Sequence, residues 1–433
     1  MFVREMKSMS SYKPRLVDKQ IENSLKAYGA INIVGAKWIG KTWAGRNHSK
    51  SEFLLMNPSG NYQNRLLAET DVSLIFEGAI PRLIDEWQEV PEIWDATRYK
   101  CDEDGIKGKY ILACSTVLPK SKQDKIKHSG AGRIKKLKMY PMSLYESGDS
   151  TGDVSLRDIY NNKVKGKLTG EINLKDIIKL VLRGGWPGSM DVPFDEAIKL
   201  PKEYIKQIID TDIDRISDVK RDLHKVMLLL RSLSRNETTT STIAKLKADI
   251  SEVDNEDIDV KTITEYLGDL NKLYLIENQL PFNSNIRSSM RVKQMEKRHF
   301  VDPSIATSIL NMTPEMCIND LFSFGFYFEA MVERDLRIYA EANGWNLFHY
   351  QDYDGNEFDA VVEFDDGDYA AFEIKLGANQ IDDAANNLIR ISNTMKENKI
   401  KPPKSLCVIC GLTNAIYTRE DGVIVIPITA LKD

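Results

Sequence analysis

Hydrophobic and polar residues follow two different periods along this chain. In the first third, short apolar runs such as Ile31 to Val34 and Tyr110 to Cys114 stand before glycine, serine or acidic residues, which predicts buried strands. From about residue 154 to 272, apolar residues recur at helical spacing. The last hundred residues predict strands again, with an amphipathic helix at 380–398. The pattern predicts an α/β multidomain protein.

Length and composition narrow the class. A chain of 433 residues predicts two to four domains, and 42% hydrophobic with 28% charged residues is typical of packed globular proteins. No apolar run approaches the roughly 20 residues of a membrane span, and the start lacks the apolar core of a secretory signal. Five cysteines indicate no disulfide framework, and Cys407 and Cys410 lie in an apolar stretch that predicts core packing. We expect a cytoplasmic protein with no membrane partner.

A nucleotide-binding loop follows the first predicted strand. The sequence fits G-x-x-x-x-G-K-[ST], with a strand before it and a helix-compatible segment after it. Glycines let backbone N–H groups close around phosphate oxygens, and a helix N-terminus adds a favourable dipole. The lysine would bridge the β- and γ-phosphates, and the threonine would ligate Mg²⁺. GTP is not excluded, but no guanine-reading motif is evident, so ATP is preferred. The predicted nucleotide-binding residues are Gly35, Ala36, Lys37, Trp38, Ile39, Gly40, Lys41 and Thr42.

Three further positions fit the chemistry of nucleotide hydrolysis. Asp85 and Glu86 end a predicted strand, where Asp85 would hold Mg²⁺ and Glu86 would polarise the attacking water. Ser115, after another buried strand, is placed to sense the γ-phosphate. Arg133 lies in a basic run of eight Lys or Arg and one acid at 120–138, and is a candidate charge-stabilising arginine in its own subunit or a neighbour.

The stretches at 12–44, 82–98 and 132–148 resemble the predicted AAA-type ATPases of archaea and bacteria, close to the STAND-type ATPases. Those proteins join an N-terminal P-loop module to a C-terminal domain of unknown function with a nuclease-like core. The resemblance also implies that the Gly185-Trp186-Pro187 turn, which follows Arg183, contacts nucleotide. On this basis we predict an ATPase domain at 1–150, a helical lid at 151–220, a winged-helix domain at 221–303 and a restriction-endonuclease-like domain at 304–433.

The segment 221–303 predicts three helices followed by a hairpin, which describes a winged helix. Lys261, Thr262 and Thr264 would lie near the start of its recognition helix. The acidic residues directly before that helix would repel phosphates, and winged helices also bind proteins. A nearby basic segment favours DNA; it comprises Arg287, Arg291, Lys293, Lys297 and Arg298.

The C-terminal segment predicts helix, strand, strand, strand, helix, strand, an order that resembles restriction-endonuclease-like (PD-(D/E)XK) folds. The resemblance implies a metal site at Asp359 and Glu373, with Lys375 on the same strand face and Glu329 as an additional acidic ligand. Two carboxylates suit a divalent ion that activates water for phosphodiester cleavage. The alternation of apolar and charged residues in this stretch also fits a strand whose charged residues face solvent.

Two functional hypotheses follow from these patterns. In the first, ATP binding and hydrolysis control a winged-helix and a nuclease-like domain acting on DNA. In the second, the protein is a nucleotide-switched scaffold that binds a protein partner and cleaves nothing. Net charge, at −5, gives no bulk attraction to nucleic acid. An oligomer is compatible with both hypotheses.

Overall fold

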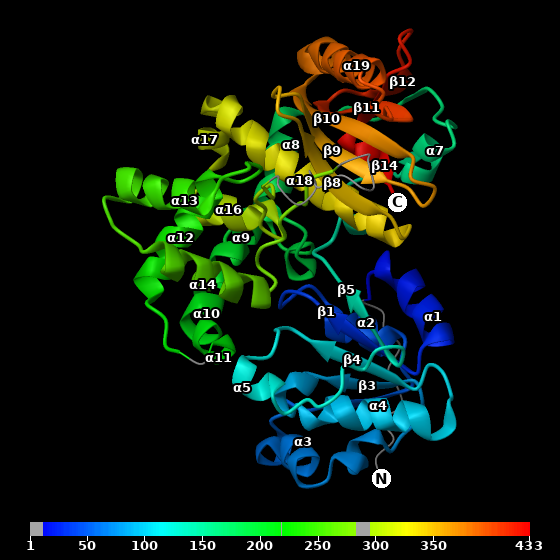
Figure 1. Ribbon diagram of the computed structural model, residues 1–433, viewed down its shortest axis with the longest axis vertical. Helices are drawn as coiled ribbons and strands as arrows, with labels where there is room; N and C mark the ends of the chain where they lie inside the picture. The colour runs from blue at the N-terminus through cyan, green and yellow to red at the C-terminus, as the bar shows by residue number, and fades with distance from the viewer. Residues whose placement is uncertain (1–11, 218, 283–294) are drawn as a thin grey trace. The chain divides into compact units, whose positions relative to one another are not determined.

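The computed structural model describes residues 12–217, 219–282 and 295–433 (Figure 1). The chain forms two compact units that divide after Tyr140. The first unit contains a five-stranded parallel sheet in the order β2-β3-β4-β1-β5. Its strands are β1 (Ala30–Val34), β2 (Ser51–Leu54), β3 (Arg82–Asp85), β4 (Tyr110–Cys114) and β5 (Ile134–Lys138).

Burial explains the strand pattern of the first unit. Every residue of β1 and β4 is buried, whereas Lys135 and Lys136 of the edge strand β5 are exposed. The strands predicted at 31–34 and 110–114 are therefore confirmed. The helices are α1 (Val17–Ala27), α2 (Lys41–Asn47), α3 (Ser59–Thr70), α4 (Glu92–Asp104) and α5 (Lys120–Gln123).

The second unit contains a seven-stranded mixed sheet in the order β7-β12-β13-β11-β10-β9-β8. Helix α19 packs its apolar face on this sheet, with Leu388 in one core cluster with Phe358 and Val408. Its strands are β7 (Lys167–Leu168), β8 (Asn346–Gln351), β9 (Glu357–Glu363), β10 (Tyr369–Gly377), β11 (Ser405–Leu412), β12 (Ala415–Thr418) and β13 (Ile424–Pro427). A separate pair joins β6 (Val154–Ser155) to β14 (Leu431–Lys432). The predicted order from the long helix to β11 is confirmed.

Helices connect the two sheets along the chain. Those at 156–216 are α7 (Leu156–Tyr160), α8 (Leu174–Arg183), α9 (Phe194–Ala197), α10 (Leu200–Thr211) and α11 (Ile213–Ile216). Those that follow are α12 (Leu223–Arg235), α13 (Ile243–Asp249), α14 (Val260–Lys272), α16 (Pro303–Ile309), α17 (Pro314–Asn319), α18 (Leu321–Ala342) and α19 (Ile381–Glu397). No helix of the described ranges is long and apolar enough to cross a membrane.

The region proposed as a winged helix contains the three expected helices, α12, α13 and α14. Antiparallel bridges Ile276↔Phe300 and Gln279↔Lys297 follow them. Arg287, Arg291 and Lys293 lie outside the described residues. Lys297 and Arg298 are 1% and 8% exposed, so the expectation that these two cations face DNA is wrong. Their charged groups make hydrogen bonds inside the fold.

Candidate functional site

Two glycines shape the loop between β1 and α2. Gly35 has φ 147°, and a Cβ at this position would lie 2.3 Å from the carbonyl oxygen of Met139, so a side chain would not fit. Gly40 caps α2 with φ 96°, a left-handed conformation that glycine adopts without strain. The helix therefore begins at Lys41 with its unpaired N–H groups directed to the loop. This is the geometry of a phosphate cradle.

Lys41 is folded into this loop. Its ammonium donates to the carbonyl oxygen of Ala36 at 2.6 Å, and the side chain is 7% exposed. Burial lowers the pKa of Lys41, while the nearby carboxylates of Glu86 and Asp85 oppose that shift. Trp38, at the tip of the loop, has φ 69° and is 39% exposed. The Lys41 ammonium therefore lies inside the loop, and the Trp38 ring lies on its exposed side.

Thr42 and Asp85 meet below the loop. The Thr42 hydroxyl donates to Asp85 Oδ2 at 3.0 Å, although 43 residues separate them in the chain. Burial, and then the charge of Glu86, raises the pKa of Asp85 to about 6. A hydroxyl and a carboxylate are oxygen ligands of the kind Mg²⁺ prefers. These residues fit a Mg²⁺ ion bound with a nucleotide.

Glu86 is held by two polar neighbours. The Ser115 hydroxyl donates to Glu86 Oε2 at 3.1 Å, and the Gln88 amide donates to the same oxygen. Glu86 itself, directly after β3, has a left-handed backbone with φ 58°. The structure thus brings together Lys41, Thr42, Asp85, Glu86 and Ser115, as the sequence predicted. Gln88 was missed, because a buried glutamine two residues after an acidic pair has no distinguishing pattern.

Arg133 is not brought to this site. It precedes β5, whose first residue, Ile134, pairs with Ala30 at the start of β1, whereas the phosphate loop follows the end of β1. The Arg133 guanidinium donates to Asp102 Oδ1 at 2.8 Å on the surface. A role for Arg133 at its own subunit's nucleotide is therefore wrong, since the length of the sheet separates the two. Its action on a neighbouring subunit stays a prediction.

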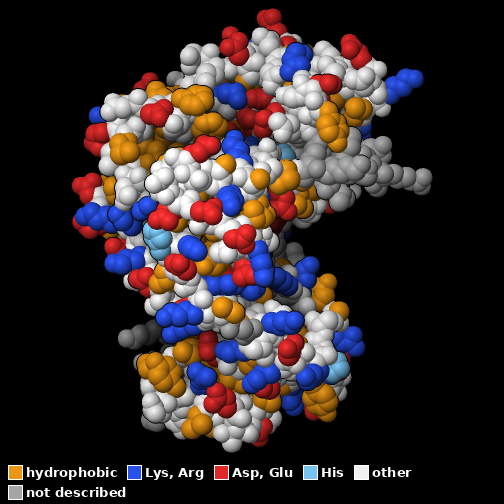
Figure 2. All heavy atoms as spheres, turned by 60° about the vertical axis from the view of Figure 1, so that its left-hand side comes forward, with side chains coloured by type: hydrophobic (Ala, Val, Ile, Leu, Met, Phe, Trp, Pro, Cys, Tyr) orange, Lys and Arg blue, Asp and Glu red, His pale blue; other side chains and the backbone are white. Residues whose placement is uncertain are grey.

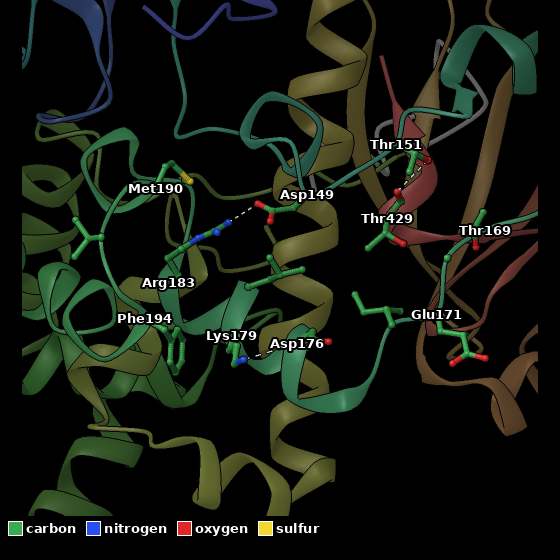
Figure 3. A pocket seen from close by; sticks show the side chains of 14 residues that line it. Asp149, Thr151, Thr169, Glu171, Asp176, Lys179, Arg183, Met190, Phe194 and Thr429 are labelled. Atoms are coloured by element: carbon green, nitrogen blue, oxygen red, sulfur yellow. Dashed lines mark hydrogen bonds and ion pairs between the residues drawn. The ribbon is translucent and has the colours of Figure 1, made fainter. Parts of the chain in front are cut away.

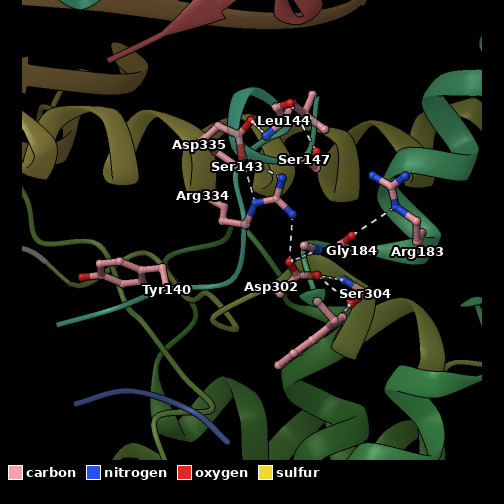
Figure 4. A network of polar contacts seen from close by, with 12 residues as sticks. Tyr140, Ser143, Leu144, Ser147, Arg183, Gly184, Asp302, Ser304, Arg334 and Asp335 are labelled. Carbon is pink, nitrogen blue, oxygen red and sulfur yellow. Dashed lines mark hydrogen bonds and ion pairs between the residues drawn. The ribbon is translucent and has the colours of Figure 1, made fainter. Parts of the chain in front are cut away.

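The Gly184–Pro187 turn is part of a buried network in the second unit (Figure 4). Asp302 accepts the N–H of Gly185 at 2.9 Å and pairs with Arg334 at 2.8 Å. A Cβ on Gly185 would lie 2.1 Å from the carbonyl oxygen of Met142. Trp186 is fully buried. Within its unit this turn is buried and closely packed. Its contact with nucleotide stays a prediction.

The network also holds the start of the second unit. The Arg334 guanidinium donates to Asp335, and Asp335 Oδ2 accepts the N–H of Leu144 at 2.9 Å. Met142 N–H donates to the carbonyl oxygen of Gly185 at 2.6 Å. Burial raises the pKa of Asp335, and Arg334 opposes that shift. Helix α18 thereby fixes both the turn and the segment that enters the unit.

A cavity of about 480 Å³ opens beside the same turn (Figure 3). Lys179 and Arg183, one helical turn apart on α8, line it. Arg183 pairs with Asp149 at 2.5 Å, and Lys179 lies 3.7 Å from Asp176. Glu171 adds another carboxylate. Because the cations already have acidic partners, the lining indicates no preference for an anion.

The nuclease-like residues gather on β9 and β10. Lys375 lies 2.6 Å from Glu373 Oε2 and 3.3 Å from Asp359 Oδ2. Asp359 Oδ2 also accepts the N–H of Ile374 at 2.7 Å, and the Asn387 amide donates to Glu373 at 2.9 Å. Burial, followed by the charge of Asp359, raises the pKa of Glu373 to about 7. The three predicted residues are therefore adjacent, and Lys375 pairs with both carboxylates.

A second, buried lysine occupies the space beside them, and the sequence analysis missed its role. The Lys297 ammonium contacts Glu329 Oε1 at 2.5 Å, Glu333 Oε1 at 2.9 Å and the carbonyl oxygen of Asp359 at 3.2 Å. His299 lies 3.1 Å from Glu333. Within the described ranges, no group of three or more His, Cys, Asp or Glu residues is arranged to hold a metal ion. Glu329, predicted as a metal ligand, is paired with a lysine.

Three family models match separate parts of this sequence. Residues 27–148 match an AAA domain, residues 174–316 match a domain of unknown function (DUF8612), and residues 324–431 match another (DUF4143). No curated protein matches the sequence. Residues 27–148 therefore form an AAA-type P-loop ATPase domain.

Two solved structures are similar to the chain. A Walker-type ATPase of Pyrococcus abyssi has 14% identity and a TM-score of 0.41, over 71% of this chain and 99% of its own. The Hef helicase domain of Pyrococcus furiosus has 9% identity and a TM-score of 0.20, over 93% of this chain and 90% of its own. At these TM-scores neither neighbour assigns the fold of the remaining chain.

Proposed function

We propose that this protein binds Mg²⁺–ATP at the phosphate loop and hydrolyses it. The observation that carries the proposal is the hydrogen bond from Thr42 Oγ1 to Asp85 Oδ2, at 3.0 Å. Thr42 lies in the first turn of α2, which begins at Lys41. Thr42 and Asp85 would hold Mg²⁺, which would neutralise phosphate charge. The Lys41 ammonium would leave the Ala36 carbonyl and bind the β- and γ-phosphates.

Glu86 would act on the attacking water. Ser115 and Gln88 both donate hydrogen bonds to its carboxylate. A γ-phosphate that accepts the Ser115 hydroxyl would release one of these bonds and free Glu86 to orient water. Ser115 would thereby report the γ-phosphate to the catalytic carboxylate.

The test is steady-state ATP turnover with Mg²⁺, together with nucleotide binding by calorimetry. Lys41→Ala is expected to lose ATP binding and turnover, whereas Glu86→Gln is expected to bind ATP and lose at least about a hundredfold in turnover, the scale of a positioned general base. Arg65→Ala, which removes an exposed ion pair with Glu69, serves as the surface control. Unchanged turnover in Glu86→Gln would refute its role, and unchanged binding in Lys41→Ala would refute the site.

For the C-terminal domain we propose a binding platform that does not cleave DNA. The observation that supports this proposal is Lys297, whose buried ammonium pairs with Glu329, the predicted additional metal ligand, and with Glu333. Lys375, which pairs with Asp359 and Glu373, belongs to the nuclease pattern itself and does not separate the two hypotheses. With Lys297 in place, Glu329 and Glu333 are compensated without a metal.

A cleavage assay separates this platform from the nuclease hypothesis. Linear, nicked, branched and single-stranded DNA would be incubated with Mg²⁺ or Mn²⁺, with and without ATP, beside an Asp359→Ala variant. We expect no cleavage in any lane. Metal-dependent cutting that disappears in Asp359→Ala would overturn the platform and establish a nuclease.

DNA binding through the proposed winged helix is a separate proposal. The described part of α14 exposes Lys261 but also Glu265, which pairs with Arg221, and acidic residues precede the helix. Binding of duplex DNA would be measured at increasing salt, because phosphate contacts release counterions and weaken with salt. Absence of binding even at low salt would leave a protein as the partner.

A further inference from the structure

Helices α17 and α18 expose a cluster of large apolar side chains. Phe322 is 81% exposed and Phe326 37%, and their rings meet edge to face with centroids 5.5 Å apart. Met316, Ile318 and Leu321 are 50%, 38% and 45% exposed. We name these five residues the α17–α18 patch. Figure 2 shows exposed hydrophobic side chains at several places on one face, with acidic side chains near some of them. Exposed apolar side chains that cluster mark interaction sites.

A glycine lies within the patch. Gly325 stands inside α18, between Phe322 and Phe326, and a Cβ built on it meets nothing within 4 Å. Glycine inside a helix is less favourable than alanine, and no neighbour in this chain requires it here. On the helix surface, residues three and four apart are neighbours, so Gly325 leaves a shallow notch beside Phe322 and Leu321. A notch between large apolar residues allows a second helix to approach closely.

The charged residues nearest to the patch in the sequence are acidic. Glu315 and Asp320 are exposed beside it, and no Lys or Arg occurs between Arg298 and Arg334. A partner that buried the patch would gain from basic residues beside its own apolar stripe.

We propose that the α17–α18 patch binds an amphipathic helix of a partner protein, with basic residues flanking the apolar face. The helix would lay its apolar stripe over Phe322 and Phe326, cross α18 at Gly325, and place its cations near Glu315 and Asp320. This docking goes beyond the proposed nucleotide site, because no residue of the phosphate loop takes part.

The test uses the full chain and two fluorescent 18-residue helical peptides, one built from Leu and Lys and one from Leu and Glu. Fluorescence anisotropy would give the Kd of each. We expect the Leu/Lys peptide to bind saturably and at least about tenfold more tightly than the Leu/Glu peptide, and Glu315→Lys to reduce that preference.

Three variants separate docking from folding. Phe322→Ser is expected to weaken Leu/Lys binding about tenfold, and Gly325→Leu, which fills the notch with a good helix former, to weaken it while the melting temperature holds or rises. Leu168→Ser, 79% exposed in the wild type and elsewhere in the unit, is expected to bind normally. Equal affinity for the two peptides, or no effect of Phe322→Ser, would overturn the proposal. A concentration-dependent dimer that Phe322→Ser abolishes would instead assign the patch to a second copy of this chain.

Discussion

Replacing Lys297 with methionine tests how the second unit is held together. The ammonium is 1% exposed and contacts Glu329 and Glu333 at 2.5 and 2.9 Å. Its removal leaves the buried carboxylate of Glu333 and the partly buried carboxylate of Glu329 without their cation, and losing one partner of a buried pair costs about 3–5 kcal/mol. For a unit of this size we expect the melting temperature to fall by roughly 6–10 °C.

The pH dependence of this loss has a definite sign. Burial, more than any neighbouring charge, raises the pKa of Glu329 to about 8. A carboxyl whose folded pKa lies above its unfolded value binds protons more tightly in the folded state, so its contribution to stability falls as pH rises from about 4.5 toward about 8. Without Lys297 this effect grows, and the destabilisation by Lys297→Met should be larger at pH 8 than at pH 5.

Thermal unfolding followed by circular dichroism at both pH values is the assay. The matched control is the variant Lys297→Met with Glu329→Gln and Glu333→Gln, which removes the uncompensated charges along with the ammonium. We expect it to recover much of the lost melting temperature. The reasoning fails if Lys297→Met melts within about 2 °C of the wild type, a shift of roughly 1 kcal/mol, or if the triple variant melts no higher than the single one.

Three other predictions follow from the two units. Because Asp85 has a pKa of about 6 and must lose its proton to ligate Mg²⁺, the affinity for Mg²⁺–ATP should fall up to about tenfold per pH unit below that value. Calorimetry from pH 5 to 8 checks this, and Asp85→Asn should remove the step. Gly185→Ala should lower the free energy of unfolding by about 1–3 kcal/mol or more in urea, since its methyl would strike the Met142 carbonyl 2.1 Å away. Arg133→Ala should leave ATP turnover of a dilute monomer unchanged, and a large loss there would place Arg133 at the nucleotide.

The first unit could be predicted well because its signals are local. The phosphate loop concentrates its glycines, Lys41 and Thr42 in eight residues, and β1 and β4 are continuous apolar runs. The position of Arg133 could also have been deduced. It precedes a strand parallel to β1, and parallel strands place their first residues at the edge opposite the phosphate loop.

The second unit shows what local patterns leave out. Its strand order to β11 follows from alternation and turn residues, but the pairing of β12 with β7 joins segments some 250 residues apart. Lys297 stands in a basic stretch that resembles a solvated surface, and only the tertiary fold reveals that it pairs with Glu329 and Glu333. Burial of a charge depends on distant partners, which a window of sequence does not contain.

The exposed ring of Trp38 makes the phosphate loop visible to spectroscopy. Trp38 and Trp43 are 39% and 45% exposed and flank Lys41 in the chain, whereas Trp94 is partly buried and Trp87, Trp186 and Trp345 are at most 5% exposed. Water quenches and red-shifts the emission of exposed indoles, so the two beside Lys41 would dominate any change that nucleotide causes. The protein therefore carries its own optical label, and ATP could be titrated by native fluorescence without attaching a dye.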